Sequence, residues 1–176
     1  KAEKIYRTYI RKYGKKVEPF RSVIAYNKIY EIYKKKPKKN KRQIRKLLKA
    51  VTVFTNLVPD EAKDHPIIKN AIARSLFLNL ETDYTKYQNL KFTGKSRKDT
   101  KVLKAFISQF DELKAAYTKV IQVGDPDFAI ASLARLGQVN WHFSSSLLDA
   151  PVPADLDMDQ QELYMSMLSE KAAPVE

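Results

Sequence analysis

Apolar side chains recur every three or four positions along most of the chain, which is the spacing of one face of an α-helix. The clearest stripe lies in residues 99–123 and consists of Val102, Phe106, Phe110, Leu113, Tyr117 and Val120. Similar stripes run through residues 20–33, starting near Pro19, and through residues 44–58. The alternation of apolar and polar residues that marks a half-buried strand is missing, and residues 91–99 form the only hairpin-like loop. The pattern therefore predicts an all-α protein.

Three further helices follow from apolar content and from the residues at helix ends. Residues 67–80 are apolar on most sides, so they predict a central helix with neighbours on both flanks. The last long helix is expected to begin after Asp125 as its N-cap, with Pro126 in the first turn, and to run toward Leu148. A shorter acidic helix is expected near residues 157–171.

Three segments share a pattern near the end of a predicted helix. A small or apolar residue is followed by an aromatic residue four positions on, an apolar residue seven positions on, and then a helix breaker. The three sets are Ala2, Tyr6 and Tyr9 with Gly14; Ala50, Phe54 and Leu57 with Pro59 and Ala62; and Leu113, Tyr117 and Val120 with Asp125 and Pro126. Each set resembles the second helix of a tetratricopeptide (TPR) repeat, and Leu133, Leu136 and Gly137 resemble the first helix. The aromatic positions are 48 and 63 residues apart instead of about 34, so the chain resembles a divergent, elongated TPR protein.

A narrower resemblance covers residues 113–176. The segments YTKVIQVGDPDFAIASLARLGQVNWHFSSSLLDAPVP and DQQELYMSMLSEKAAPVE are similar to a block of long envelope-associated TPR proteins of gliding and predatory bacteria. These resemblances imply antiparallel helix pairs stacked as a TPR-like α-solenoid, with residues 1–176 as a single domain within a longer array. They also imply a non-enzymatic interaction scaffold of a bacterial cell-envelope complex, in the periplasm or at the outer membrane. A cytoplasmic location is the alternative.

The net charge of +13 is concentrated toward one end of the chain. Residues 1–49 carry 19 Lys and Arg against 3 Asp and Glu, whereas residues 125–176 carry 2 against 9. This layout predicts that the basic third prefers an acidic partner. It also predicts weak, salt-sensitive self-association, in which the acidic third of one molecule meets the basic third of another.

The densest basic run is KKKPKKNKRQIRK, residues 34–46, with nine cations and no acid. We interpret it as a solvated turn between two helices, in which Pro37 and Asn40 break the helix and lysines suit the end of the preceding one. The alternative is a nucleic-acid or polyanion site that releases counterions from phosphates, although the run has no aromatic residue for base stacking. A nuclear-localisation signal is a third interpretation, which needs a eukaryotic source. The polyanion-binding residues would be Lys34, Lys35, Lys36, Lys38, Lys39, Lys41, Arg42, Arg45 and Lys46.

Candidate chemistry is sparse. The chain has no cysteine, and its sequence contains no cofactor fingerprint, phosphate loop or metal-ligand spacing, so we expect neither an enzyme nor a bound cofactor or metal. His142, Ser144 to Ser146 and Asp149 could suggest a catalytic triad, but they follow one another along one helix without the exposed turn that a nucleophile needs. The acidic residues 155–162 lack the glycine and the glutamate of a calcium loop, and they fit helix capping instead.

The sequence offers four candidate residues for partner binding, namely Asn27, Tyr30, Asn140 and Trp141. The lone tryptophan lies near the end of a helical stripe, so we expect it in the core. If it is exposed on a concave face, it becomes a candidate contact for a peptide, because aromatic residues dominate interface hot spots. No apolar run reaches the length of about 18 residues that a transmembrane helix needs. The sequence therefore predicts a helical scaffold that binds another protein or peptide, with nucleic acid only as the alternative partner.

Overall fold

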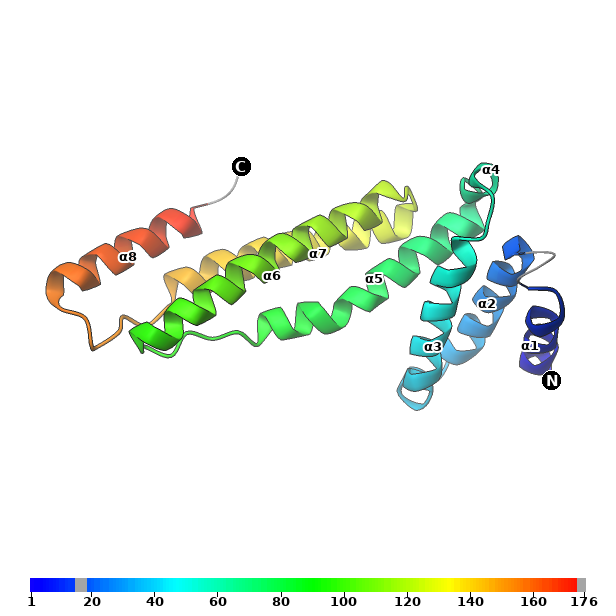
Figure 1. The fold of residues 1–176 in the computed structure, drawn as a ribbon, viewed down its shortest axis with the longest axis horizontal. Coiled ribbons are helices and arrows are strands. Elements are labelled where there is room, and N and C mark those ends of the chain that lie inside the picture. Colours follow the sequence, from blue (N-terminus) through cyan, green and yellow to red (C-terminus); the bar gives the residue numbers. More distant parts are fainter. Residues whose placement is uncertain (15–18, 174–176) are drawn as a thin grey trace. The chain divides into compact units, whose positions relative to one another are not determined.

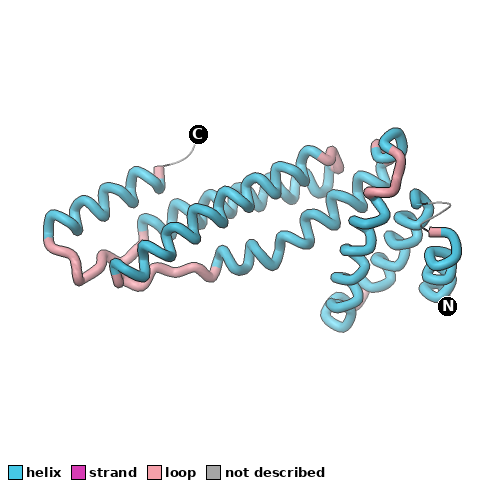
Figure 2. The backbone as a smooth tube through the Cα atoms, in the orientation of Figure 1, coloured by secondary structure: helices cyan, strands magenta, loops and turns pink. Residues whose placement is uncertain are grey.

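The computed structural model of the protein describes residues 1–14 and 19–173. These residues form eight helices and no strand (Figures 1 and 2). The helices are α1 (Ala2–Tyr13), α2 (Pro19–Lys34), α3 (Pro37–Thr55), α4 (Asp60–Lys63), α5 (Pro66–Gln88), α6 (Ser96–Gln122), α7 (Pro126–Leu148) and α8 (Met158–Ala172). The prediction of an all-α fold is confirmed. None of the described helices is both long enough and apolar enough to cross a bilayer.

Most of the long helices begin and end close to the predicted positions. The predicted start of α7 is confirmed, because the Asp125 carboxylate accepts a hydrogen bond from the Phe128 backbone N–H (3.1 Å) and Pro126 is the first helical residue. Helix α5 is longer than its apolar segment and continues to Gln88. Helix α3 differs most from the expectation, since it begins at Pro37 and includes most of the basic run.

The helices group into two compact units. Unit 1 consists of Lys1–Asn79 and Val120–Ile130, and unit 2 consists of Leu80–Lys119 and Ala131–Glu176. Helices α5, α6 and α7 contribute residues to both units. The interpretation of residues 1–176 as a single repeat domain stays a prediction.

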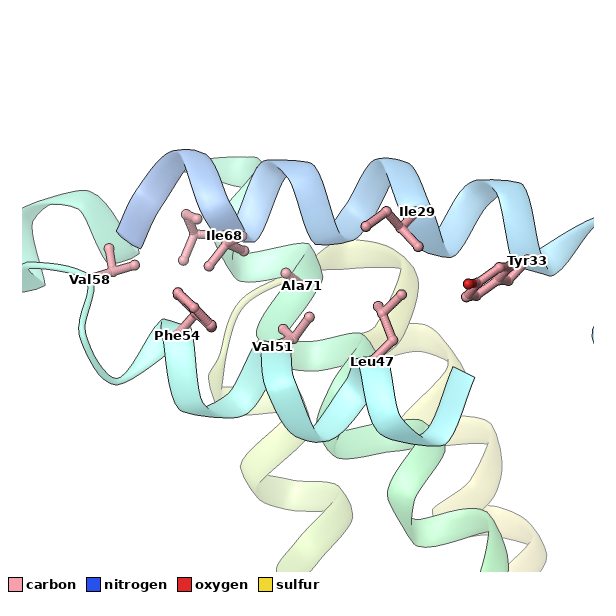
Figure 3. Packing of buried hydrophobic residues seen from close by; sticks show 9 residues of the cluster. Ile29, Tyr33, Leu47, Val51, Phe54, Val58, Ile68 and Ala71 are labelled. Atoms are coloured by element: carbon pink, nitrogen blue, oxygen red, sulfur yellow. The ribbon is translucent and has the colours of Figure 1, made fainter. Parts of the chain in front are cut away.

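Unit 1 is held together by an apolar cluster between α2, α3 and the first turns of α5 (Figure 3). Its members are Val23, Ile29 and Tyr33 from α2, Leu47, Val51 and Phe54 from α3, the following Val58, and Ile68 and Ala71 from α5. None of them is more than 7% exposed. The α3 members are spaced by three or four residues, so they form one stripe that points toward α2. Complete burial of a large apolar side chain contributes about 1.5–3 kcal/mol, so this stripe fixes the position of α3.

A polar cluster and apolar contacts of Tyr6 and Ile10 attach α1 to the rest of unit 1. The Arg7 guanidinium donates hydrogen bonds to the Tyr33 hydroxyl (2.8 Å) and to the Glu3 carboxylate (2.8 Å). The Tyr33 hydroxyl in turn donates to Glu3. The hydrogen bonds from Tyr33 and Arg7 lower the pKa of Glu3. Tyr33 therefore joins the apolar cluster to α1.

Helix α1 ends at Tyr13, and the following Gly14 packs closely against α2 and α3. A Cβ atom at this position would lie 3.0 Å from the Phe54 ring and 3.0 Å from the Ser22 hydroxyl oxygen. The φ angle of Gly14 is −57°, so close approach rather than backbone conformation requires glycine. Gly124, just beyond the end of α6, has a φ of 76°, which disfavours other residues.

Helix α5 has neighbours on both flanks within unit 1, as predicted. On one flank, the Ser75 hydroxyl donates a hydrogen bond to the backbone carbonyl of Leu48 in α3 (3.0 Å). On the other flank, the Asn70 side-chain amide donates to the Asp125 carboxylate, which precedes α7 (3.0 Å). Both bonds join residues that are far apart in the sequence, and they place α5 between α3 and the α6–α7 connection.

Unit 2 is organised around stacked aromatic rings from α5, α6 and α7. The ring centroids are 4.9 Å apart for Tyr87 and Phe106, 5.4 Å for Phe106 and Phe143, and 4.1 Å for Phe110 and Phe143. These contacts agree with the side-by-side course of α6 and α7 in Figure 1. The Tyr87 hydroxyl donates a hydrogen bond to the Val139 carbonyl (3.1 Å), and burial raises the pKa of Tyr87. The rings thus supply the apolar contact among the three helices, and the Tyr87 hydroxyl supplies a polar link between α5 and α7.

The connection between α5 and α6 is folded around the buried carboxylate of Asp99. This carboxylate accepts hydrogen bonds from the backbone N–H and the hydroxyl of Thr93 (2.8 and 2.9 Å) and from the backbone N–H of Gly94 (2.9 Å). Ser96, the first residue of α6, donates its backbone N–H to Asp155 in the segment before α8 (3.3 Å). Two carboxylates therefore fix the start of α6.

Helix α8 begins with a capping box. The Asp157 carboxylate accepts a hydrogen bond from the Gln160 backbone N–H (2.8 Å), and the Gln160 side-chain carbonyl accepts one from the Asp157 backbone N–H (3.2 Å). The helix-capping interpretation of acidic residues 155–162 is confirmed for Asp157. Leu168 and Ala172 form the buried side of the helix.

We predict that Asp99→Ala lowers the free energy of unfolding by about 3 kcal/mol, because three donors lose a charged acceptor inside the fold. Asp111 is exposed on the same helix, so Asp111→Ala should change this free energy by less than about 0.5 kcal/mol. Urea denaturation followed by circular dichroism measures both variants. Equal losses in the two variants would contradict the structural role of Asp99.

Candidate partner-binding surfaces

The nine cations of residues 34–46 lie where α2 meets α3, and we call this surface the basic corner. The first cation ends α2, the next two form the connection, and the other six lie in the first three turns of α3. The interpretation as a turn is therefore wrong for most of the run. Pro37 starts the helix instead of breaking it, because the first helical residue needs no backbone N–H donor. Asn40 lies inside α3, and its side-chain amide donates a hydrogen bond to the Tyr33 carbonyl near the end of α2 (3.1 Å).

The charge of the basic corner is almost uncompensated. All nine cationic side chains are exposed, and within the described residues only Lys34 has an acid in reach, Glu31 at 4.0 Å. Helix α3 begins without a side-chain cap and has no acid in its first turn, although a helix N-terminus favours negative charge. Mutual repulsion among the cations and the helix dipole both favour an anionic partner at this corner.

The structure brings the candidate residues Asn27 and Tyr30 together around Arg74 of α5. The guanidinium carbon of Arg74 lies 4.3 Å from the centre of the Tyr30 ring, and its Nη1 donates a hydrogen bond to the Asn27 side chain (3.4 Å). Glu31 lies 3.8 Å from the same nitrogen, and Asn70 accepts a hydrogen bond from Nη2. Asn27 and Tyr30 thus help to hold α2 against α5. Their role in partner contact stays a prediction.

A second polar cluster lies in unit 2 around Arg135 of α7. Its guanidinium donates two hydrogen bonds to the Glu81 carboxylate of α5 (3.1 and 2.9 Å) and one to the Gln138 side chain (2.6 Å). The Tyr84 ring centre lies 4.6 Å from the guanidinium carbon. A two-point contact between arginine and a carboxylate is both strong and geometrically specific. These residues and Trp141 line an open pocket of about 430 Å³.

Trp141 lies at the edge of this pocket and is 72% exposed, with the exposed Asn140 beside it on α7. The expected core position of Trp141 is therefore wrong. Its neighbours Val139 and Phe143 are the buried residues of this turn, and a residue two positions from each lies about 200° around the helix. Exposure is one part of the condition under which Trp141 becomes a candidate contact, and its place on a concave face stays a prediction. Contact with a partner stays a prediction.

The side chains that could suggest a catalytic triad follow one another along α7. The Ser146 hydroxyl lies 3.5 Å from His142 Nδ1, and the Ser145 hydroxyl donates a hydrogen bond to the His142 carbonyl (3.4 Å). Asp149 is linked to Ser145 through its backbone N–H (2.9 Å). The His142 ring packs edge-on against Tyr87, with a centroid distance of 5.1 Å. The contacts among His142, the serines and Asp149 join successive turns of one helix, whereas the His142 ring packs on Tyr87 of α5. The expectation of a non-enzymatic protein stays a prediction.

Comparisons with known protein families, with curated proteins and with solved structures find no match to this chain. The resemblance to TPR proteins, and the location that it implies, therefore stay predictions.

Sequence reasoning missed the polar clusters of Arg74 and Arg135. Arg135 bonds to a carboxylate 54 positions away, and Arg74 bonds to Asn27 at a separation of 47 positions, so no local pattern connects them. One signal was present, because Arg135 is the single basic residue in segment 125–170. A lone arginine in a helix that packs against the core is expected to have a hydrogen-bond acceptor nearby, because a charge removed from water without a partner is costly.

We predict that Trp141 fluoresces like an indole in water, because the single tryptophan of the chain is 72% exposed. Its emission maximum should be red-shifted, and acrylamide should quench it nearly as well as it quenches a free tryptophan amide. Steady-state fluorescence of the folded and the urea-unfolded protein measures this. A blue-shifted emission that moves to the red on unfolding would contradict the exposed position.

We predict that mild acid destabilises the protein through His142. Burial lowers the pKa of His142 below its ordinary value of 6.5. The unfolded chain then binds a proton more readily than the folded chain does, so the free energy of unfolding falls as the pH drops from about 7.5 to about 5.5.

The variant His142→Phe keeps a ring in this position and should lose that part of the pH dependence. Urea unfolding of both proteins at the two pH values measures the difference. The carboxylate of Glu3, whose pKa is lowered from 4.5, titrates below this window. An equal loss of stability in wild type and variant would show that another group is responsible.

Proposed function

We propose that the protein is a non-enzymatic scaffold that binds an acidic segment of another protein, with the basic corner as its main contact surface. The observation that carries this proposal is the set of nine exposed cations of residues 34–46, of which a single one lies near an acid among the described residues. No reaction chemistry is needed for such a role.

The basic corner is suited to binding because its cations stand on a fixed backbone. The hydrogen bond from Asn40 to Tyr33 and the buried stripe of α3 hold the two helices together. A surface that is already ordered loses less entropy on association than a flexible chain does. Single exposed ion pairs contribute only about 0.2–1 kcal/mol, so affinity would come from many pairs and would decrease with salt.

The proposal extends to the arrangement of the helices and to the location of the protein. We infer that antiparallel pairs such as α2 and α3 belong to a TPR-like α-solenoid within a bacterial cell-envelope complex. The all-helical composition and the short α2–α3 connection support the first part. The sequence resemblance of residues 113–176 supports the second part. Asn140 and Trp141 would then be further contacts for the partner.

A second candidate function is the binding of nucleic acid or another polyanion by the same nine residues. The observation that favours it is the uncapped start of α3 among lysines, since helix N-termini and lysines both attract phosphate. The basic corner has no aromatic side chain for base stacking, so such binding would not depend on base sequence.

We predict that neutralising the basic corner weakens binding of a fluorescently labelled polyglutamate peptide. The variant Lys38→Gln/Lys39→Gln/Lys41→Gln/Arg42→Gln should lose about tenfold or more in affinity, which corresponds to about 1.4 kcal/mol. The matched control Lys91→Gln/Lys95→Gln/Lys98→Gln/Lys101→Gln removes as many exposed cations from unit 2 and should bind like wild type. Fluorescence anisotropy at several salt concentrations measures each protein.

The same titrations with a mixed-sequence DNA duplex separate the two candidate functions. Tighter binding of the duplex than of the peptide, with a steep salt dependence, would favour the polyanion function. Equal losses in the corner variant and the control would mean that net charge, rather than the basic corner, attracts the peptide. Absence of peptide binding by the wild type at low salt would remove the proposal.

A further inference from the structure

The outward face of α1 combines lysines with apolar side chains. Lys4, Ile5, Thr8, Tyr9, Lys12 and Tyr13 line an open pocket of about 560 Å³ on this helix. Ile5 is 67% exposed, and the rings of Tyr9 and Tyr13 lie next to each other with a centroid distance of 5.4 Å. Glu3 is the single acid of α1, and it is bound to Arg7 and Tyr33. The outward face is therefore an apolar strip, and the charged residues that line it among the described part of the chain are all lysines.

The outward face of α8 has the opposite charge. Asp159, Leu163 and Glu170 follow one another at helical spacing on the side opposite the buried Leu168, and Glu162 lies beside them. Leu163 is 61% exposed, and none of these three acids has an ion-pair partner within the described part of the chain. This face therefore presents the exposed Leu163 among three acids.

We propose that the protein associates head to tail, with the outward face of α1 in one copy packed against the outward face of α8 in a second copy. The two faces are complementary in charge, and each presents an exposed apolar side chain to the other. Ile5 and Tyr13 would cover Leu163, while Lys4 and Lys12 would meet Glu162 and Glu170. Because different surfaces of the two copies meet, each pair of copies keeps one face of each kind free, and the contact extends into an open chain or a closed ring of molecules.

The contact is small, so it is weak and depends on concentration and salt. One helix packed on one helix buries less than the roughly 1,200 Å² of a standard interface. Raising the ionic strength from about 0.01 M to about 1 M shortens the screening length from about 30 Å to about 3 Å. The ion pairs between the lysines of α1 and the glutamates of α8 are then screened. Only the apolar contact of Leu163 with Ile5 and Tyr13 still holds the two faces together. The proposed surface uses none of the nine cations of the basic corner, so it is independent of the function proposed above.

Sedimentation velocity of the full chain over a range of concentrations tests the proposal, with charge reversals on each face. Lys4→Glu/Lys12→Glu makes the α1 face acidic, and Glu162→Lys/Glu170→Lys makes the α8 face basic. All four residues are exposed, and circular dichroism should show unchanged helix content in both variants. We expect wild type to form larger species at low salt, with smaller species at high salt. Each variant alone should stay monomeric.

An equimolar mixture of the two variants should associate again, because each reversed face then meets a partner of opposite charge. Lys38→Glu/Lys39→Glu changes the net charge as much as the α1 variant does and should still associate. Association that survives in either single variant, or a mixture that stays monomeric, would overturn the proposal, and so would a wild type that is monomeric at every concentration. Peptide binding by the basic corner is measured separately, so failure of one proposal leaves the other testable.

Discussion

The fold depends on helices that bury an apolar stripe, and neighbouring helices must cover that stripe. In unit 1 the stripe of α3 from Leu47 to Phe54 meets α2 and the start of α5. In unit 2 the aromatic rings of α5, α6 and α7 cover one another. All charged side chains are left to the outside or must be paired, because an unpaired buried charge is too costly. The basic residues of segment 1–49 and the acidic residues of segment 125–176 therefore lie mostly on the surface, where partners can reach them.

The periodicity that builds these stripes is local, and this is why the all-α class and most of the helices could be predicted. Helices α2, α6, α7 and α8 were found from their apolar spacing and caps. The start of α3 was not found, because charge and Pro37 were interpreted as signs of a turn. Lysine and arginine are in fact good helix formers, and proline fits the first helical position. The apolar stripe begins at Ile44, but the helix begins earlier, at Pro37. The residues between these two positions are not part of the buried cluster.

The missed features depend on contacts that no local pattern describes. The pairs around Arg74 and Arg135 join residues about fifty positions apart, and they follow from which helices become neighbours. Trp141 is a different case, because the buried spacing of Val139 and Phe143 already places it on the opposite face. Hydrophobic character alone misplaced it in the core. The charged surface of the candidate site could therefore be predicted from the sequence. The side-chain clusters around Arg74 and Arg135 could not, because tertiary contacts hold them in place.

The two basic surfaces of unit 1 differ in how they can select a partner. The basic corner offers cations with little exposed apolar area, so any flexible anionic chain satisfies it and salt weakens every such contact alike. The outward face of α1 adds Ile5 and Tyr13 to its lysines, so it favours a partner that also presents an apolar side chain, such as Leu163. Apolar burial does not decay with salt in the way that ion pairs do. If both proposals hold, raising the salt concentration reduces binding at the basic corner before it removes the attraction at α1. One chain would then hold two anionic partners whose binding responds differently to salt.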